Sequence, residues 1–257
     1  MTFMSKAKIL ITNDDGINAP GLSVLIEVMK ELGDVTVVAS ENSMSGMGHA
    51  VTISSPLRLE QVQTNNGYEE YKCNGTPADC VKLGEQLILK QKPDLLVSGV
   101  NHGSNASINI IYSGTMAAVL EGAICGFPSI GFSLMDYNLN ADFSASKKYI
   151  KLIAQKVLAQ GLPKGVCLNV NFPAVNGNQI KGIKVCRQAK ARWAEEFDER
   201  KDPRNKDYFW MTGNFQKQET AEDTDIYALE NNYVSVVPVH VDFTAHYALP
   251  EINKLNF

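Results

Sequence analysis

The sequence of 257 residues lacks several features that mark large classes of protein. Its apolar run near the N-terminus, Ile9 to Thr12, is too short for the hydrophobic region of a signal peptide or for a membrane span. It also lacks a basic excess, because 24 lysines and arginines stand against 28 acidic residues. A general nucleic-acid binder usually carries such an excess. We therefore expect a cytoplasmic protein with no membrane and no nucleic-acid polymer among its partners.

Cysteine and histidine are scarce as well. The five cysteines are odd in number and form no C-x-x-C pair, so we expect buried free thiols in a reducing compartment. The four histidines and five cysteines show none of the spacings of a structural zinc site. The chain has no internal repeat and no low-complexity tract. Its 44% hydrophobic content is that of an ordinary globular protein with a sizeable core.

The hydrophobic pattern alternates between strands and helices. Short apolar strands are expected at Lys8–Thr12, Val35–Ala39, Asp94–Ser98, Ser129–Ser133, Val166–Asn171 and Tyr233–Val239. Helices are expected at Leu22–Leu32, from Thr76-Pro77 towards Lys90, at Ser113–Cys125 and at Ala145–Gln160. Val51–Arg58 and Tyr68–Cys73 flank the polar stretch QTNNG and suggest a hairpin. This order predicts an α/β fold, with a mostly parallel sheet covered by helices on both faces.

The character of the chain changes after Pro173. Residues 187–207 are rich in charges of both signs, and Trp193, Phe197 and the sequence Tyr208-Phe209-Trp210 lie in or just after them. One interpretation is a solvated, charge-balanced hairpin or loop. The other is an arm that packs its aromatic side chains on another subunit. We expect a single domain over residues 1–257, with an oligomerisation arm at about 187–235.

Two neighbouring acids, Asp14 and Asp15, follow the first strand in the sequence ILITNDDGINAPG. Their repulsion and desolvation are both relieved by a bound cation, and oxygen ligands suit Mg²⁺, Mn²⁺ or Ca²⁺. Amide and hydroxyl oxygens of Asn101 and Ser45 would complete the ligand shell, because both residues lie in loops that follow other strands. The alternative is a simple turn, since Asn-Asp-Asp-Gly is rich in turn-forming residues.

A second segment, IYSGTMAAVLEG, combines hydroxyl groups with the start of a helix. The backbone amides, the hydroxyls of Ser113 and Thr115 and the helix dipole make a possible phosphate cradle. Ordinary helix capping by Ser113 is the competing explanation. A metal site beside an anion site indicates metal-assisted phosphate chemistry. Asp242 and His246 lie four apart and would meet on one face of a helix, where they are candidates to protonate a leaving group.

Seven motifs then occur in a specific order from Lys8 to about His246. They are ILITNDDGINAPG, SMSG, NGTPADC, DLLVSGVNHGSN, IYSGTMAAVLEG, LNVNFP and YVSVVPVHVDFTAH. In these motifs the chain resembles the stationary-phase survival protein SurE family of metal-dependent 5'-nucleotidases. The resemblance implies a Rossmann-like three-layer core with a C-terminal hairpin arm exchanged between subunits, giving a homodimer or homotetramer. It also implies hydrolysis of nucleoside 5'- and often 3'-monophosphates, with short polyphosphate as a further substrate in some members.

The same resemblance implies roles for individual residues. The metal ligands would be Asp14, Asp15, Ser45 and Asn101, holding one divalent cation per subunit, Mg²⁺ or Mn²⁺. The phosphate contacts would be Asn105, Ser113, Gly114 and Thr115. The polar tail motif near the site would be Asp242 and His246. One departure stands out: the family often has basic residues before the serine of the second loop, whereas this chain reads ENSMSG.

The leading hypothesis is a phosphomonoesterase in which Asp14 or Asp15 also orients the attacking water. A phospho-aspartyl intermediate ranks lower, because the metal needs both carboxylates. Paired acids also occur in metal-dependent nucleotide-sugar transferases, which gives a second enzyme hypothesis. The third is a nucleotide-binding module without turnover.

Overall fold

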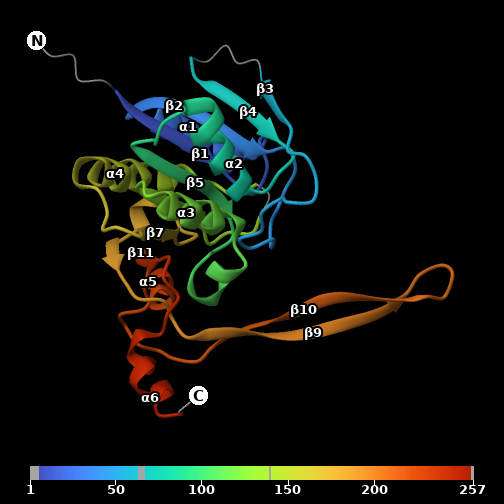
Figure 1. Ribbon diagram of the computed structural model, residues 1–257. Coiled ribbons are helices and arrows are strands. Elements are labelled where there is room, and N and C mark those ends of the chain that lie inside the picture. The colour runs from blue at the N-terminus through green and yellow to red at the C-terminus, as the bar shows by residue number, and fades with distance from the viewer. Residues whose placement is uncertain (1–5, 63–66, 139, 256–257) are drawn as a thin grey trace, which may run out of the picture.

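The computed structural model describes residues 6–62, 67–138 and 140–255, in which helices and strands alternate (Figure 1). The strands are β1 (Ala7–Thr12), β2 (Gly33–Ser40), β3 (Leu59–Val62), β4 (Glu69–Cys73), β5 (Leu95–His102), β6 (Ser129–Leu134), β7 (Val166–Phe172), β8 (Gly182–Val185), β9 (Ala191–Lys201), β10 (Asp207–Lys217) and β11 (Tyr233–His240). The helices are α1 (Pro20–Met29), α2 (Pro77–Leu83), α3 (Gly114–Cys125), α4 (Ser144–Gln160), α5 (Asp225–Glu230) and α6 (Leu249–Asn253). Shorter helical segments are η1 (Gly84–Leu89), η2 (Ser107–Ile111), η3 (Gly177–Gln179) and η4 (His246–Ala248).

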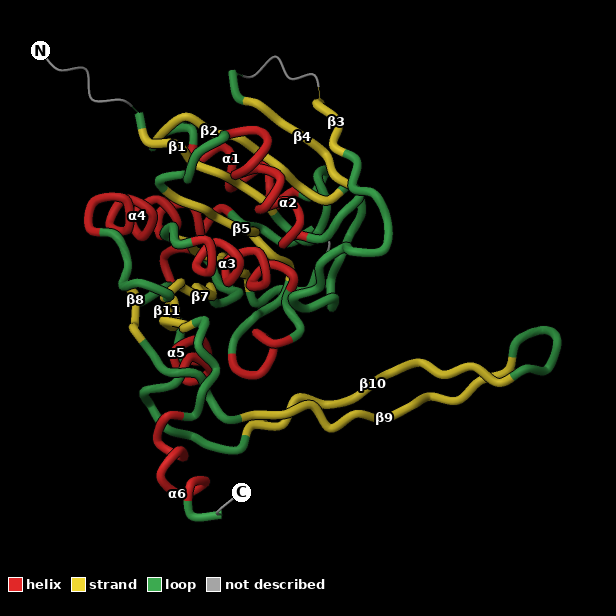
Figure 2. Tube along the Cα trace, viewed as in Figure 1, coloured by secondary structure: helices red, strands yellow, loops and turns green. Residues whose placement is uncertain are grey.

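One large sheet forms the middle layer of the body, in the order β3-β4-β2-β1-β5-β6-β7-β11-β8. From β4 to β7 each strand runs parallel to its neighbour. At one edge β3 pairs antiparallel with β4, and towards the other β11 pairs antiparallel with β7 and parallel with the edge strand β8. Helices α1 and α4 pack together on one face, and α2 and α3 pack together on the other. Figure 2 shows the strands between the two sets of helices. The predicted three-layer α/β core is confirmed.

The strand predicted at Val51–Arg58 is wrong. Residues 51–58 form no strand, and the first strand of the hairpin is β3, which pairs with β4. Side chains from elsewhere hold this segment: the Asp79 carboxylate accepts the Thr52 N–H, and the Asn74 side chain accepts the Arg58 N–H at 2.7 Å. These bonds occupy donors that a sheet would otherwise use. Most of the expected turn, residues 63–66, lies outside the described residues.

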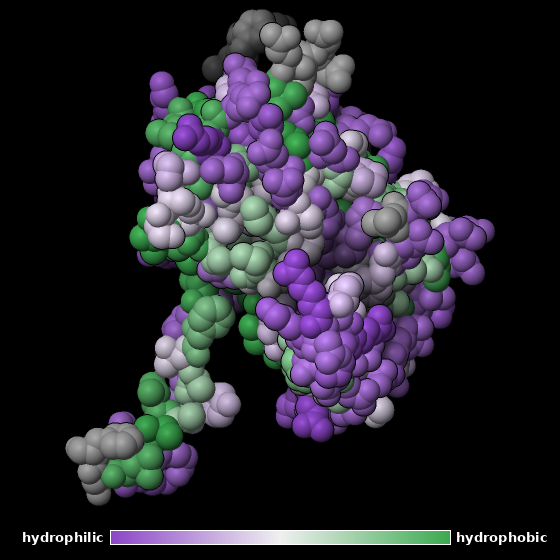
Figure 3. All heavy atoms as spheres, turned by 90° about the vertical axis from the view of Figure 1, so that its right-hand side faces the viewer, coloured by the Kyte–Doolittle hydropathy of each residue, from purple (hydrophilic) through white to green (hydrophobic). Residues whose placement is uncertain are grey.

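The hairpin of β9 and β10 projects from the body as a long arm (Figure 1). Its strands cover Ala191–Lys217, whereas the expected arm covered about 187–235. The difference arises because α5 packs against β11, which belongs to the large sheet. The arm exposes large apolar side chains, among them Phe197, Phe209, Trp210 and Met211. Figure 3 views the arm from its tip, where hydrophilic side chains gather.

The cysteines and the lengths of the helices bear on two of the sequence predictions. All five cysteines are free thiols, as predicted, and four of them are buried, whereas Cys125 is only partly buried. Among the described residues no helix is both long and apolar enough to cross a membrane.

Candidate functional site

The two acids lie where the strand order of the sheet reverses. Thr12, the last residue of β1, pairs with Ser98 of β5, and β2 lies on the other side of β1. Ligand sites of parallel sheets form beyond the carboxyl ends of strands at such a point. Gly16 turns the chain away with a φ of +99°, and the Asn13 side chain donates to its carbonyl oxygen at 2.8 Å. The turn predicted for Asn-Asp-Asp-Gly is therefore present, and it places Asp14 and Asp15 at this edge of the sheet.

A backbone hydrogen bond holds the loop after β2 at the same edge of the sheet. The Met44 N–H donates to the Asp14 carbonyl oxygen at 2.7 Å. The Ser45 hydroxyl lies 3.0 Å from the hydroxyl of Ser43. The bond from Met44 to Asp14 places Ser45 beside the acids although the two segments are separated by a helix and a strand.

Asn101 is presented by a bulge in β5. The pairing with β6 shifts by one residue between Ser98 and Asn101. Helix α1 packs against this bulge so tightly that a Cβ on Gly21 would lie 1.9 Å from the Val100 carbonyl oxygen. The Asn101 amide nitrogen donates to the carbonyl oxygens of His102 and Gly103, at 3.0 and 2.9 Å. Its side-chain oxygen therefore remains available to coordinate a cation.

Asp14 is nearly inaccessible to solvent and lies against the start of α3. A Cβ on Gly114 would stand 2.7 Å from the Cβ of Asp14, so glycine permits this approach. The Thr115 hydroxyl donates to the Asp14 carboxylate. Burial raises the pKa of Asp14 to about 6, the hydrogen bond from Thr115 opposes the rise, and the charge of Asp15 adds to it. No lysine or arginine of the described chain forms an ion pair with either acid.

Among the described residues, the side chain of Asp15 is held by His102. The backbone N–H of His102 donates to the Asp15 carboxylate at 3.2 Å, and the ring Nδ1 lies 3.3 Å from the same oxygen. The imidazole packs edge-on against Phe143 with ring centroids 4.9 Å apart. Asp15 is therefore fixed by contacts that leave its second oxygen free of protein donors in the described chain.

The predicted phosphate side is built from α3 and the loop after β5. Ser113 is the N-cap of α3, and its hydroxyl accepts the Met116 N–H at 3.0 Å. The loop residue Asn105 donates its side chain to Ser133 and its backbone N–H to Asn171, both at 2.8 Å. Helix capping and a phosphate cradle, the two interpretations of the Ser113 segment, are therefore compatible, because the serine caps the helix and also faces the site.

A cavity of about 240 Å³ brings together five of the ten predicted residues. Its lining includes Asp14, Ser45, Asn101, Asn105 and Ser113. Asp15 lies next to it through His102, which also lines the cavity. Thr115 is fully buried with its hydroxyl engaged by Asp14.

Asp242 and His246 do not line this cavity. They contact each other at 2.7 Å, as their spacing suggested, but residues 242–245 form no helix. An Asx turn brings them together instead, in which the Asp242 carboxylate accepts the Thr244 N–H at 2.8 Å. Hydrogen bonds from Thr244 and His246 hold the pKa of Asp242 far below its usual range. Both side chains are exposed.

The donor set fits a hard divalent cation. Two carboxylates, one hydroxyl and one amide oxygen are the ligands that Mg²⁺ and Mn²⁺ prefer. Among the described residues no group of three or more His, Cys, Asp or Glu side chains could hold a metal. A cation at this position would therefore need neutral oxygens beside the acid pair.

Sequence reasoning missed the supporting side chains of β7. Asn171 accepts the Asn105 N–H, and Asn169 donates to the Asn105 carbonyl oxygen at 2.8 Å. Both asparagines are buried. The signal was present in the sequence LNVNF, where two polar residues alternate with apolar ones on one face of a buried strand. The aromatic lining by Tyr112 and Trp193 was missed as well.

Comparison with known proteins agrees with this geometry. Residues 9–195 match the model of the family described as "Survival protein SurE". The chain belongs to the SurE family. A SurE relative named "5'-nucleotidase SurE" from Flavobacterium psychrophilum is 59% identical over 252 residues, covering 98% of each chain. A relative of the same name from Christiangramia forsetii is also 59% identical, over 255 residues and 98% of each chain.

The fold agrees with a solved SurE structure. The crystal structure of the SurE protein from Aquifex aeolicus superposes with a TM-score of 0.84 and is 40% identical. The match covers 97% of this chain and 100% of that one. The resemblance inferred from the ordered motifs is thus confirmed at the level of the family.

Proposed function

We propose that the protein is a metal-dependent 5'-nucleotidase, which hydrolyses nucleoside monophosphates to nucleoside and phosphate. The observation that supports this most is the acid pair, of which Asp14 is buried and lines a cavity beside a helix N-terminus, while neither acid has a lysine or arginine partner in the described chain. The relatives that carry the name 5'-nucleotidase match almost the whole chain. Activity on 3'-monophosphates belongs to the same proposal.

The cation would be held by Asp14, Asp15, Ser45 and Asn101, one ion per subunit, with Mg²⁺ or Mn²⁺ as candidates. Such an ion supplies charge neutralisation for a phosphate and makes water more acidic. Thr115 and His102 act through the ligands, because each donates to one of the two carboxylates. Asp14 or Asp15 accepts a hydrogen bond from the attacking water and orients it.

The phosphoryl group would lie against the start of α3 and Asn105. The first backbone N–H groups of a helix have no acceptor within the helix, so they attract the oxygens of a phosphate. Ser113, Gly114 and Asn105 line or border this position, and Thr115 contributes by holding Asp14. His246, paired with Asp242, stays the candidate proton donor for the leaving group.

A nucleotide panel tests the proposal. Purified protein is incubated with nucleoside 5'- and 3'-monophosphates in Mg²⁺, in Mn²⁺ and with a chelator, and released phosphate is measured. The proposal expects metal-dependent release from AMP alone, without a sugar acceptor or donor. A nucleotide-sugar transferase would release none under these conditions, and a binding module would bind AMP without turnover. Release that survives the chelator would contradict the metal site.

The arm suggests self-association as part of the same proposal. Apolar side chains on β9 and β10 are exposed in the single chain, and contiguous exposed apolar surface marks interfaces. A homodimer or homotetramer in which the arms cover this surface fits these exposures. The five free thiols suit the reducing cytoplasm, where we place the protein. Sedimentation of the wild type and of Phe209→Ser separates a monomer from an oligomer.

A further inference from the structure

The cavity at the acid pair continues into a second, more apolar cavity. Tyr112 and Trp193 line both of them. The second cavity has a volume of about 480 Å³ and is otherwise lined by Met211, Thr212 and Gly213 of the arm. A ligand held by its phosphate at the acid pair would therefore reach two aromatic side chains next.

Trp193 is fixed in place from two sides. Its indole N–H donates to the Asn109 side chain at 2.8 Å, and its ring meets Phe215 edge-on with centroids 5.4 Å apart. Asn109 in turn donates to the Ser104 carbonyl oxygen at 3.0 Å. The ring is thus tied to the loop that also carries the proposed phosphate contact Asn105.

The root of the arm is tied to the same loop through a buried carboxylate. Asp225 accepts the Ser107 N–H at 2.8 Å and the Ala189 N–H at 2.9 Å. The Ser107 hydroxyl donates back to the Ala189 carbonyl oxygen at 2.8 Å. These bonds keep the beginning of β9 against the site, so Trp193 is positioned by the body of the protein as well as by the arm.

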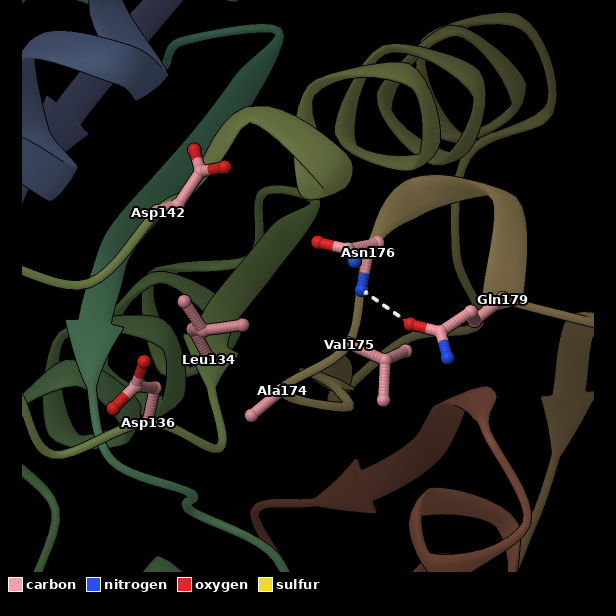
Figure 4. Close-up of a pocket in the computed structure, with 7 residues that line it drawn as sticks. All are labelled: Leu134, Asp136, Asp142, Ala174, Val175, Asn176 and Gln179. Carbon is pink, nitrogen blue, oxygen red and sulfur yellow. Dashed lines mark hydrogen bonds between the residues drawn. The ribbon is translucent and has the colours of Figure 1, made fainter.

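A cavity at the ends of β6 and β7 offers the wrong chemistry for the rest of a nucleotide (Figure 4). It shares no lining residue with the acid-pair cavity, and two of its residues are the acids Asp136 and Asp142. Their carboxylates already accept the N–H groups of Asn138 and Ser144. This cavity carries charges that would repel a nucleotide phosphate.

An aliphatic cavity beside α3 is the main alternative location for the base of a nucleotide. It shares Ser113 with the acid-pair cavity and has a volume of about 370 Å³. Its lining is mainly aliphatic, with Phe243 as its one large aromatic ring among the described residues and His49 at its edge. Bases stack on aromatic faces, and the two rings shared by the other cavities offer more of that surface.

We propose that Tyr112 and Trp193 form the subsite for the base of the nucleoside monophosphate, and that Trp193 sets the preference for nucleotides over base-free phosphomonoesters. This inference rests on the proposed nucleotidase function and adds a substrate-binding residue to it. The ribose spans the junction of the two cavities, and the base lies against the aromatic side chains at the root of the arm.

The test compares AMP with ribose 5-phosphate, which has the same phosphate and sugar but no base. We expect Trp193→Ala to lower kcat/KM for AMP about 5- to 100-fold, mainly through KM, as expected from the loss of a stacking partner. For ribose 5-phosphate the change should stay within about twofold, because the phosphate contacts are untouched. Trp193→Phe should recover most of the AMP activity. Tyr247→Ala, which removes an exposed aromatic side chain outside the arm that lines neither cavity, is the control and should change kcat/KM for neither substrate.

Several results would overturn the subsite. One is a wild type that hydrolyses ribose 5-phosphate as efficiently as AMP, and another is a Trp193→Ala variant that loses both activities equally. A selective loss of AMP activity in Phe243→Ala, with Trp193→Ala unaffected, would move the base to the aliphatic cavity. If the wild type releases phosphate from neither compound, the nucleotidase proposal fails, and AMP binding by calorimetry then decides. Binding that depends on Trp193 would keep the subsite, and binding that does not would reject it.

Discussion

Two buried carboxylates lie along helix α3, and their surroundings are opposite. Glu121, in the middle of the helix, is 2.9 Å from the His49 ring and also pairs with the Lys82 ammonium at 2.5 Å. Asp14, at the start of the helix, has a hydroxyl donor and a second acid as neighbours. The pKa of Glu121 is lowered to about 2, first by His49 and then by Lys82, while burial raises the pKa of Asp14 to about 6.

The contrast separates a structural carboxylate from a functional one. Glu121 has the Lys82 ammonium and the His49 ring as partners within the chain, so it joins α2, α3 and the loop after β2 without needing a ligand. Asp14 carries a charge that the described chain does not balance with lysine or arginine. A buried charge without a partner costs stability and persists where it serves binding or catalysis. The missing counter-charge is the reason to expect a cation there.

The largest expected effect comes from removing the charge of Asp14. Asp14→Asn keeps the shape and still accepts the Thr115 hydroxyl, but it loses half of the anionic ligand charge. Phosphate release from AMP should fall on the order of 10³-fold. Initial rates at saturating Mn²⁺ measure this, with circular dichroism to verify the fold. Full activity in this variant would show that the site assignment is wrong.

Removing the charge of Glu121 should affect stability instead. Its lowered pKa, about 2 against the ordinary 4.5, means that Glu121 stabilises the fold above pH 4.5 and that this contribution is lost as pH falls towards 2. Because the Lys82 ammonium is partly exposed and water screens the pair, Glu121→Gln should destabilise the protein by about 1 to 2 kcal/mol at pH 7, and by less at pH 3. Urea unfolding at both pH values checks this. An equal loss at both would mean that packing, not the charge, accounts for the effect.

Asp14 predicts the reverse dependence on pH in metal-free protein. Its raised pKa favours the neutral form in the folded state, so stability falls as pH rises from about 4 to about 6 and stays low above that. Relative to the wild type, Asp14→Asn should gain about 3 kcal/mol at pH 7.5 and almost nothing at pH 3.5. Chelator-treated samples unfolded in urea test this. A variant that is less stable than the wild type at pH 7.5 would remove the contrast with Glu121.

The acid site was largely predictable because its residues follow strands. Asp14, Ser45 and Asn101 come after β1, after β2 and at the end of β5, and the carboxyl ends of adjacent parallel strands meet at one edge. The layers of the fold followed from the same alternation. Local hydrophobic periodicity predicts where each strand ends, and therefore where the residues that follow it lie.

Contacts between distant side chains could not be predicted in this way. The bond from Lys82 to Glu121 joins residues 39 positions apart, and that from Trp193 to Asn109 joins residues 84 apart. The misplaced strand at Val51–Arg58 has the same origin, since Asp79 and Asn74 capture its backbone donors. No local pattern encodes these partners, because they arise only when separate elements pack.

The most direct measurement of the central claim is calorimetric titration of Mn²⁺ into chelator-treated protein. The account predicts one ion bound per chain in the wild type. It predicts unchanged binding in Glu121→Gln, and binding weakened at least tenfold in Asp14→Asn. Absence of binding in the wild type, or equal affinity in wild type and Asp14→Asn, would contradict the assignment of the acid pair as a cation site.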